Sequence, residues 1–287
     1  MTGASGFTGR YVCEALTNAG FDPAPLVLPS GTATVNLLQE DHVTDAVNHI
    51  SPAAVIHLAA VSYVDHANVA DLYATNIAGT RNLLKALCEL NSKPEIVILA
   101  SSANVYGHGT SSALPETAPM NPANDYAISK LAMEEVAKLW SNQLPICIAR
   151  PFNYTGLGQA GHFLVPKIVN AFRSKQSELE LGNLSVARDF SDVRDIAEMY
   201  TRLIRLKTAG EVINFCSGES IYLRDIVRIS SEITGHNLKV VVSPRLIRNK
   251  DILRLTGCTS KLHKTLGTLP RRSFVDTLRW MLGAPTA

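Results

Sequence analysis

Three short apolar runs, at 55–59, 95–100 and 145–149, alternate with longer segments in which apolar residues recur every three or four positions. The short runs contain few polar residues, which is typical of parallel strands that are buried on both faces. The longer segments, at 71–90 and 126–140, have the spacing of amphipathic helices. Strands that alternate with helices predict an α/β fold with a Rossmann-type doubly wound parallel sheet.

The second half of the chain has a less regular pattern. Glycine, proline and loop-forming residues are frequent near 154–162 and 243–260. Residues 186–215 again contain a helical pattern followed by an apolar run. We expect residues 1–155 to form a dinucleotide-binding domain to which 186–215 returns, and residues 156–287 to form mainly a smaller substrate-binding part.

Three glycines at three-residue spacing, Gly3, Gly6 and Gly9, stand directly before an amphipathic segment. Such glycines let a strand turn tightly into a helix whose N-terminal amides face a pyrophosphate. Glycines also serve ordinary turns, so this spacing is weak when taken alone. In a fold of this type a strand should precede the glycines, but only Met1 stands before Thr2.

Composition and charge restrict the possible partners. The 287 residues are 46% hydrophobic and 18% charged, with a formal net charge of +2, which is typical of a folded globular protein. No long basic run suggests nucleic acid, and no apolar run approaches the ~20 residues that cross a membrane. The five cysteines have no paired spacing for a metal. We therefore expect a cytoplasmic protein without a metal site.

The residues with the clearest chemical meaning are Tyr126 and Lys130, downstream of Ser101 and Ser102. Four residues apart on a helix, the phenol and the ammonium lie on one face. A cation beside a tyrosine favours the phenolate and lowers its pKa from about 10 towards the neutral range, where it can exchange protons. A serine hydroxyl at the neighbouring strand end would polarise the same carbonyl or alcohol. This set suits hydride transfer at a C–O centre.

Other polar residues near the predicted strand ends carry weaker signals. Segment 26–30 holds neither an acid for a ribose hydroxyl nor an arginine for a 2′-phosphate, so neither NAD nor NADP is favoured. Asn36 is interpreted either as a contact to the adenine edge or as a plain turn residue. His57 is interpreted as a buried structural histidine, and Asn76 as a hydrogen-bonding partner of the strands around the site.

Taken together, these segments resemble the extended short-chain dehydrogenase/reductase family of nucleotide-sugar epimerases, dehydratases and reductases. The resemblance covers nearly the whole chain and rests on the ordered set Gly3-x-x-Gly6-x-x-Gly9, 57–60, Asn76, 101–107, Tyr126-x-x-x-Lys130 and 150–153. It implies a Rossmann-type fold, NADPH or NADH as cofactor and a nucleotide-sugar substrate. It also implies a homodimer formed through the helices at 71–90 and 126–140.

The resemblance further assigns roles to individual residues. Ser102 would bind the C4 oxygen of the substrate, Tyr126 would donate a proton, and Lys130 would hold the nicotinamide ribose and tune Tyr126. The expected cofactor-binding residues are Gly3, Ser5, Gly6, Phe7, Gly9, Asn36, Leu37, Leu58, Ala59, Ala60, Asn76, Tyr126 and Lys130. The expected substrate-binding residues are Ser102, Asn104, Asn153, Lys167, Arg188, Arg248 and Asp251.

Several reactions fit this set of residues. A 4,6-dehydratase is disfavoured, because elimination needs a further acid and base, and Ala103 and Asn104 stand where dehydratase relatives carry a carboxylate. Segments 150–156, 187–193 and 215–218 resemble reductases of GDP-4-keto-6-deoxy-D-mannose and their GDP-mannose dehydratase relatives. That favours NAD(P)H-dependent reduction of a C4 keto group. A 4-epimerase with tightly bound NAD and a catalytically silent dinucleotide-binding sensor are the alternatives.

Overall fold

A computed structural model describes residues 1–29, 35–62, 68–107, 113–246, 252–269 and 271–284. Its central sheet is parallel and has the strand order β1-β2-β3-β7, formed by Ala54–His57, Ile96–Ala100, Ile146–Pro151 and Val212–Phe215. The apolar runs of the sequence therefore form strands, and the side chains of β2 and β3 are almost entirely buried. Burial on both faces explains why these runs are continuous rather than alternating.

The place of the first strand is filled by only two residues. Thr2 forms a single parallel bridge with His57: its N–H donates to the Ile56 oxygen (3.1 Å) and its oxygen accepts from the Leu58 N–H (3.3 Å). On the other side, the Met1 oxygen accepts from the Leu26 N–H (2.8 Å). This minimal pairing still delivers the chain to the carboxyl end of β1, where the glycine turn begins.

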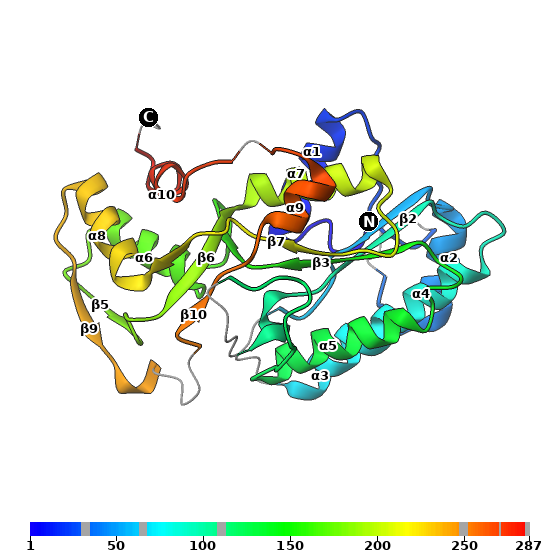
Figure 1. Cartoon of the computed structure of the whole chain (residues 1–287), viewed down its shortest axis with the longest axis horizontal. Coiled ribbons are helices and arrows are strands. Elements are labelled where there is room, and N and C mark those ends of the chain that lie inside the picture. Colours follow the sequence, from blue (N-terminus) through cyan, green and yellow to red (C-terminus); the bar gives the residue numbers. More distant parts are fainter. Residues whose placement is uncertain (30–34, 63–67, 108–112, 247–251, 270, 285–287) are drawn as a thin grey trace.

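Helices cover both faces of the sheet (Figure 1). On one face lie α1 (Phe7–Asn18), α7 (Val193–Leu206) and α9 (Ser260–Leu266), packed on apolar side chains of the strands. On the other lie α2 (Glu40–Ile50), α4 (Thr80–Glu89) and α5 (Asp125–Lys138). Two layers of helices around a parallel sheet confirm the predicted Rossmann-type fold.

The predicted helix at 71–90 is divided into three parts. A short helix α3 (Val69–Tyr73) leads into a turn of π-helix, η1 (Ala74–Gly79), before α4 begins. The π-turn carries Asn76, and such turns are frequent at functional sites.

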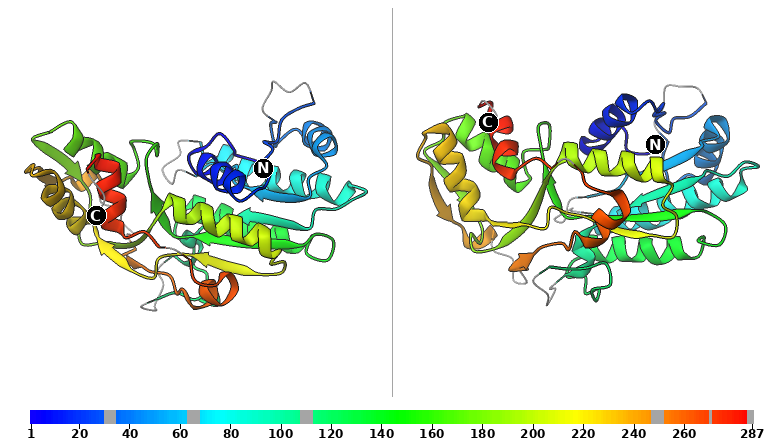
Figure 2. Two further views of the ribbon diagram at one scale, coloured as in Figure 1. Left: turned by 90° about the horizontal axis from the view of Figure 1, so that it is seen from above. Right: turned by 45° about the horizontal axis from the view of Figure 1, so that its top comes forward.

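A second group of elements lies beside the central sheet, at the left in Figure 1 and again in both views of Figure 2. Its larger sheet contains β4 (Asn153–Thr155), β6 (Ala187–Asp192), β8 (Ser220–Tyr222) and β10 (Arg254–Leu255), and a separate pair contains β5 (Glu178–Leu181) and β9 (Lys239–Val242). Helices α6 (Leu164–Arg173), α8 (Leu223–Thr234) and α10 (Phe274–Leu282) share an apolar core with these strands. The division of the chain near residue 155 stays a proposal.

Two 3-10 turns, η2 (Ala103–Tyr106) and η3 (Pro244–Leu246), complete the described elements. Among the described residues, no helix has the length and apolar character needed to cross a membrane.

Candidate active site

The glycine turn packs too closely to admit side chains. Gly3 has a φ of +69°, which favours glycine, and a Cβ there would lie 2.8 Å from the Ala59 nitrogen. A Cβ on Gly9 would lie 2.1 Å from the Gly3 oxygen. The first turn of α1 therefore sits directly on the turn, and Gly6, its N-cap, supplies no side-chain cap to the helix amides. Uncapped first-turn amides beside a glycine cradle fit the pyrophosphate of a dinucleotide.

The hydroxyls of Ser102 and Tyr126 lie at the carboxyl end of β2 and the start of α5. Ser102 accepts hydrogen bonds from the Asn104 backbone N–H (3.2 Å) and from Asn104 Nδ2 (3.1 Å). With its lone pairs engaged, Ser102 has its proton left to donate. Burial raises the pKa of Tyr126, while a hydrogen bond from Ser102 acts to lower it. The phenol is therefore protonated at neutral pH and able to act as a proton donor.

The sequence-based expectation that Lys130 lowers the pKa of Tyr126 was wrong for this structure. Lys130 is itself buried, and its Nζ donates to the Ala100 oxygen of β2 (2.8 Å). Burial lowers the pKa of Lys130 to about 8, against the opposing charge of Glu134. Removal from water dominates both groups, which the helical spacing of the two residues did not reveal.

His57 and Asn76 organise the backbone around this cluster. His57 Nδ1 shares a hydrogen bond with Thr2 Oγ1 (2.7 Å) and its Nε2 with Thr80 Oγ1 (2.9 Å). Burial and the Lys130 charge lower the pKa of His57 to about 3, so it is neutral. Asn76 binds both backbone groups of Val61 and donates to Ser129 Oγ (3.0 Å). These contacts are those of structural residues.

The other expected cofactor contacts line the rest of this edge. Leu58, Ala59 and Ala60 follow β1 directly, and the Ala59 N–H donates to Thr2 Oγ1 (3.1 Å). Ser5 and Phe7 stand in and just after the glycine turn. The Oδ1 of Asn36 accepts from the Leu38 N–H (3.0 Å), as in a turn, and Leu37 is buried against Gly79. Contacts of these residues to a dinucleotide stay predictions.

Of the described residues expected to bind substrate, Asn153, Lys167 and Arg188 lie on the second group of elements, apart from Ser102 and Asn104. Asn153, at the start of β4, has a buried Nδ2 without a hydrogen-bond partner in the described chain. Arg188 on β6 donates to the Ile252 oxygen (2.6 Å), and Lys167 on α6 donates to the Glu180 oxygen (2.7 Å). Arg248 and Asp251 fall outside the described residues.

Comparison with known proteins identifies the family. The model of the NAD dependent epimerase/dehydratase family matches residues 1–216. The chain belongs to this family. Within it, the chain is 34% identical to the GDP-6-deoxy-D-talose 4-dehydrogenase of Aggregatibacter actinomycetemcomitans, over 93% of this chain and 90% of that protein. It is also 34% identical to the GDP-6-deoxy-D-mannose reductase of Pseudomonas aeruginosa, over 98% of this chain and 95% of that one.

A solved structure of RMD from Pseudomonas aeruginosa, complexed with NADPH, has a TM-score of 0.86 and 34% identity to this chain. It covers 98% of this chain, which covers 96% of it. The chain is thus an enzyme of the extended short-chain dehydrogenase/reductase family, whose members include NAD(P)-dependent nucleotide-sugar reductases and epimerases.

The sequence did not reveal the buried polar pair next to the candidate site. Glu134 and Arg150 form a buried ion pair, with Arg150 Nη2 2.6 Å from Glu134 Oε2. Arg150 was noted only as part of a motif and Glu134 not at all, although Glu134 follows Lys130 by one helical turn. That i+4 spacing was the available signal.

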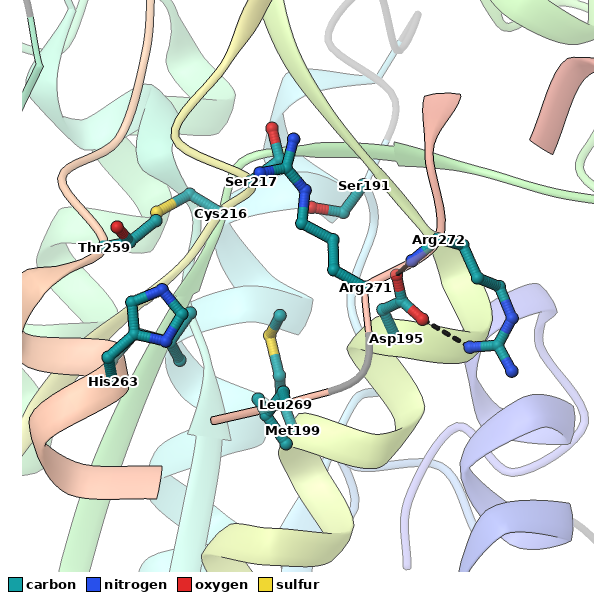
Figure 3. A pocket seen from close by; sticks show the side chains of 11 residues that line it. Ser191, Asp195, Met199, Cys216, Ser217, Thr259, His263, Leu269, Arg271 and Arg272 are labelled. Carbon is teal, nitrogen blue, oxygen red and sulfur yellow. Dashed lines mark hydrogen bonds and ion pairs between the residues drawn. The ribbon is translucent and has the colours of Figure 1, made fainter. Parts of the chain in front are cut away.

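A small cavity of about 30 Å³ lies between α7, α9 and the end of β7. Figure 3 shows Arg271 reaching into it and Asp195 bonded to Arg272. Both arginines are paired with carboxylates, Arg271 with Glu219 (2.8 Å) and Arg272 with Asp195. None of the proposed catalytic residues lines this cavity. Among the described residues, no cluster of His, Cys, Asp and Glu has the arrangement of a metal site.

Proposed function

We propose that the protein reduces the C4 keto group of a GDP-4-keto-6-deoxyhexose with NADPH or NADH. The observation that carries this proposal is the meeting of Ser102, Tyr126 and Lys130 at the carboxyl ends of the sheet, beside a glycine turn that fits a dinucleotide. Asn104 stands where an elimination would need a carboxylate, and it is engaged with Ser102. The two GDP-6-deoxyhexose enzymes at 34% identity support the sugar and the base.

The chain's own groups would handle the proton and the carbonyl oxygen. The reduced nicotinamide supplies the hydride that adds to C4. Ser102 donates a hydrogen bond to the C4 oxygen and Tyr126 transfers its proton to it, so that the carbonyl becomes an alcohol. Lys130 would hold the nicotinamide ribose, and solvent would reprotonate the phenolate left on Tyr126.

The configuration of the product depends on which face of C4 receives the hydride. The sugars named for the two relatives, 6-deoxy-talose and 6-deoxy-mannose, differ at C4. The proposed reaction therefore has two possible products from one keto sugar. Asn153, with its unpartnered Nδ2, is our candidate for orienting the sugar.

The test is incubation of purified protein with GDP-4-keto-6-deoxymannose and either NADPH or NADH. We expect loss of reduced-nicotinamide absorbance in a 1:1 ratio with a GDP-6-deoxyhexose, whose C4 configuration NMR then assigns. The rates with the two coenzymes show whether the protein prefers NADPH or NADH, which segment 26–30 does not predict. If the protein binds the coenzyme but does not oxidise it in the presence of this sugar, the proposed reductase activity is wrong.

The second candidate is a 4-epimerase, because Ser102, Tyr126 and Lys130 would serve oxidation and re-reduction equally well. An epimerase would interconvert nucleotide hexoses without added coenzyme and would be purified with NAD bound. Chromatography of UDP- and GDP-hexoses after incubation without coenzyme separates it from the reductase.

We further propose a cytoplasmic homodimer formed through the helices at 71–90 and 126–140. Val69 on α3, Ile128 on α5 and Leu139 directly after α5 are apolar and exposed (42%, 42% and 74%), and exposed apolar side chains are candidates for an interface. Light scattering during size-exclusion chromatography gives the mass, and Ile128→Glu should convert a dimer to a monomer.

A further inference from the structure

Three ionisable side chains follow one another along the buried face of α5. Tyr126, Lys130 and Glu134 are spaced four residues apart and are 8%, 5% and 1% exposed. Four-residue spacing places them one above the other on the helix. The proposed reaction uses the first two, and the third is the most deeply buried carboxylate of the helix.

Glu134 connects the helix to the strand that carries Ser102. One carboxylate oxygen, Oε1, accepts from Ser101 Oγ and from Arg150 Nε (2.9 Å). The other, Oε2, accepts from Arg150 Nη2 (2.6 Å). Ser101 continues the β2 ladder through its N–H to the Ala149 oxygen (2.7 Å). The carboxylate therefore fixes the residue that directly precedes Ser102.

Arg150 extends the connection to the rest of the sheet. It donates to the Tyr106 hydroxyl (2.8 Å) and the Glu116 oxygen (3.1 Å). Tyr106 in turn donates to Asn214 Oδ1 on β7 (2.7 Å). A buried carboxylate is tolerated only when it is paired and hydrogen-bonded, and Arg150 meets that need while leaving Ser101 as a further partner.

We propose that Glu134 is a positioning residue of the reaction, which holds the Ser101–Ser102 strand end in the arrangement that Tyr126 uses and lies one helical turn beyond Lys130. The expected effect of Glu134 on kcat rests on the proposed function. The expected effect of Glu134 on the titration of Lys130 does not depend on that function.

Among the groups around Lys130, Glu134 is the one whose charge raises the pKa of Lys130 and so favours the ammonium form. From β1, His57 is neutral because its pKa is lowered to about 3. On α5, Tyr126 is neutral because burial raises its pKa. From β2, the Ala100 oxygen accepts from the ammonium. Glu134 opposes the effect of burial, which lowers the pKa of Lys130 to about 8, and Arg150 donates to both oxygens of that carboxylate.

The test variant is Glu134→Gln, which keeps the shape and one acceptor but removes the charge. We expect kcat to fall about 10- to 100-fold, as misplacement of a reacting group does, with KM for the sugar little changed. In protein labelled with ¹³C at the lysine ε-carbon, the Lys130 signal, assigned with Lys130→Met, should titrate at a lower pH than in the parent chain.

Two further variants separate positioning from folding. Glu134→Gln with Arg150→Met restores charge balance, so it should fold even if the single variant does not, while kcat and the Lys130 titration stay altered. Asp195→Asn is the matched control, since Asp195 is also buried and paired with an arginine (Figure 3), but on α7 at the opposite face of the sheet. It should change thermal stability and leave the Lys130 titration unchanged.

The inference is overturned if the double variant recovers the parent's kcat and Lys130 titration, because Glu134 would then act only through stability. Failure of the proposed function has a different signature. The parent chain would reduce no GDP-4-keto sugar, while the NMR titration of Lys130 would still report whether Glu134 acts on it.

Discussion

The Tyr126 hydroxyl is held as a neutral phenol, because burial raises its pKa and only the Ser102 hydrogen bond opposes that shift. Tyr126→Phe removes the proton and leaves the ring in place. We expect turnover to fall by at least about 100-fold, with coenzyme affinity, measured by fluorescence titration, within about threefold of the parent. Tyr222→Phe, in an exposed tyrosine of β8, is the control. Turnover above about a hundredth of the parent rate would exclude Tyr126 as the donor.

His57 should make stability depend on pH in the acid range. Its folded pKa is about 3 and its unfolded value about 6.5, so between these values the unfolded chain binds more protons. The free energy of unfolding therefore falls as pH decreases below about 6.5, by up to ~1.4 kcal/mol per unit. Above that pH the residue contributes no slope.

His57→Gln isolates this contribution, because glutamine can still bond Thr2 and Thr80 but does not titrate. Urea unfolding of both chains at pH 7.5 and 5.5 should show the parent losing about 1 kcal/mol more than the variant. Equal losses in parent and His57→Gln would mean that His57 is not buried in its neutral form.

At the level of elements, the glycine turn and α1 form one unit, since a Cβ on Gly9 would lie 2.1 Å from the Gly3 oxygen and 2.6 Å from the Ala4 oxygen. Gly9→Ala must push the helix away from the turn, and such overpacking costs about 1–3 kcal/mol. We expect coenzyme affinity to fall at least about 10-fold with it. At Gly6 the nearest atom would be 3.2 Å away, so Gly6→Ala should be less destabilising in thermal unfolding.

Elements with a strong local signal could be predicted from the sequence. The strands around Ile98 and Ile148 are continuous apolar runs because both faces are covered, and the helix at 126–140 keeps a regular period. The π-turn at Asn76 could not be predicted, because it is stabilised by bonds to Val61 and Ser129 that only the fold brings near. Nor could the pKa of Tyr126, because burial rather than the neighbouring Lys130 determines it.

The candidate site followed the same rule. Ser102, Tyr126 and Lys130 could be proposed from the sequence because chemistry restricts their types and spacing. The i+4 spacing from Lys130 pointed to Glu134 alone, and two residues sixteen positions apart have no local pattern that reveals the buried ion pair of Glu134 with Arg150.

At the scale of the whole molecule, Asp189 links the two groups of elements. It lies on β6 with no exposed surface, and its carboxylate accepts from the Ser217 N–H and hydroxyl, the Gly218 N–H and the Gly257 N–H. Ser217 and Gly218 lie in the loop after β7 of the central sheet, whereas Gly257 lies just after β10. One buried side chain thus fixes three segments beside Arg188, the expected substrate arginine.

The Asp189 carboxylate accepts four hydrogen bonds, two at each oxygen. In Asp189→Asn an NH₂ group would replace one of these oxygens and would face two donors. We expect a loss of about 2–4 kcal/mol in the free energy of unfolding, and a higher KM for the nucleotide sugar because Arg188 is displaced. Coenzyme affinity should be retained, because the glycine turn lies beside the end of β1, at the opposite edge of the central sheet from β7. Asp276→Asn, in a carboxylate that accepts from Ser273 Oγ within the first turn of α10, should cost no more than about 1 kcal/mol. If Asp189→Asn instead weakened coenzyme and sugar binding equally, Asp189 would support the fold as a whole rather than the junction between the two groups of elements.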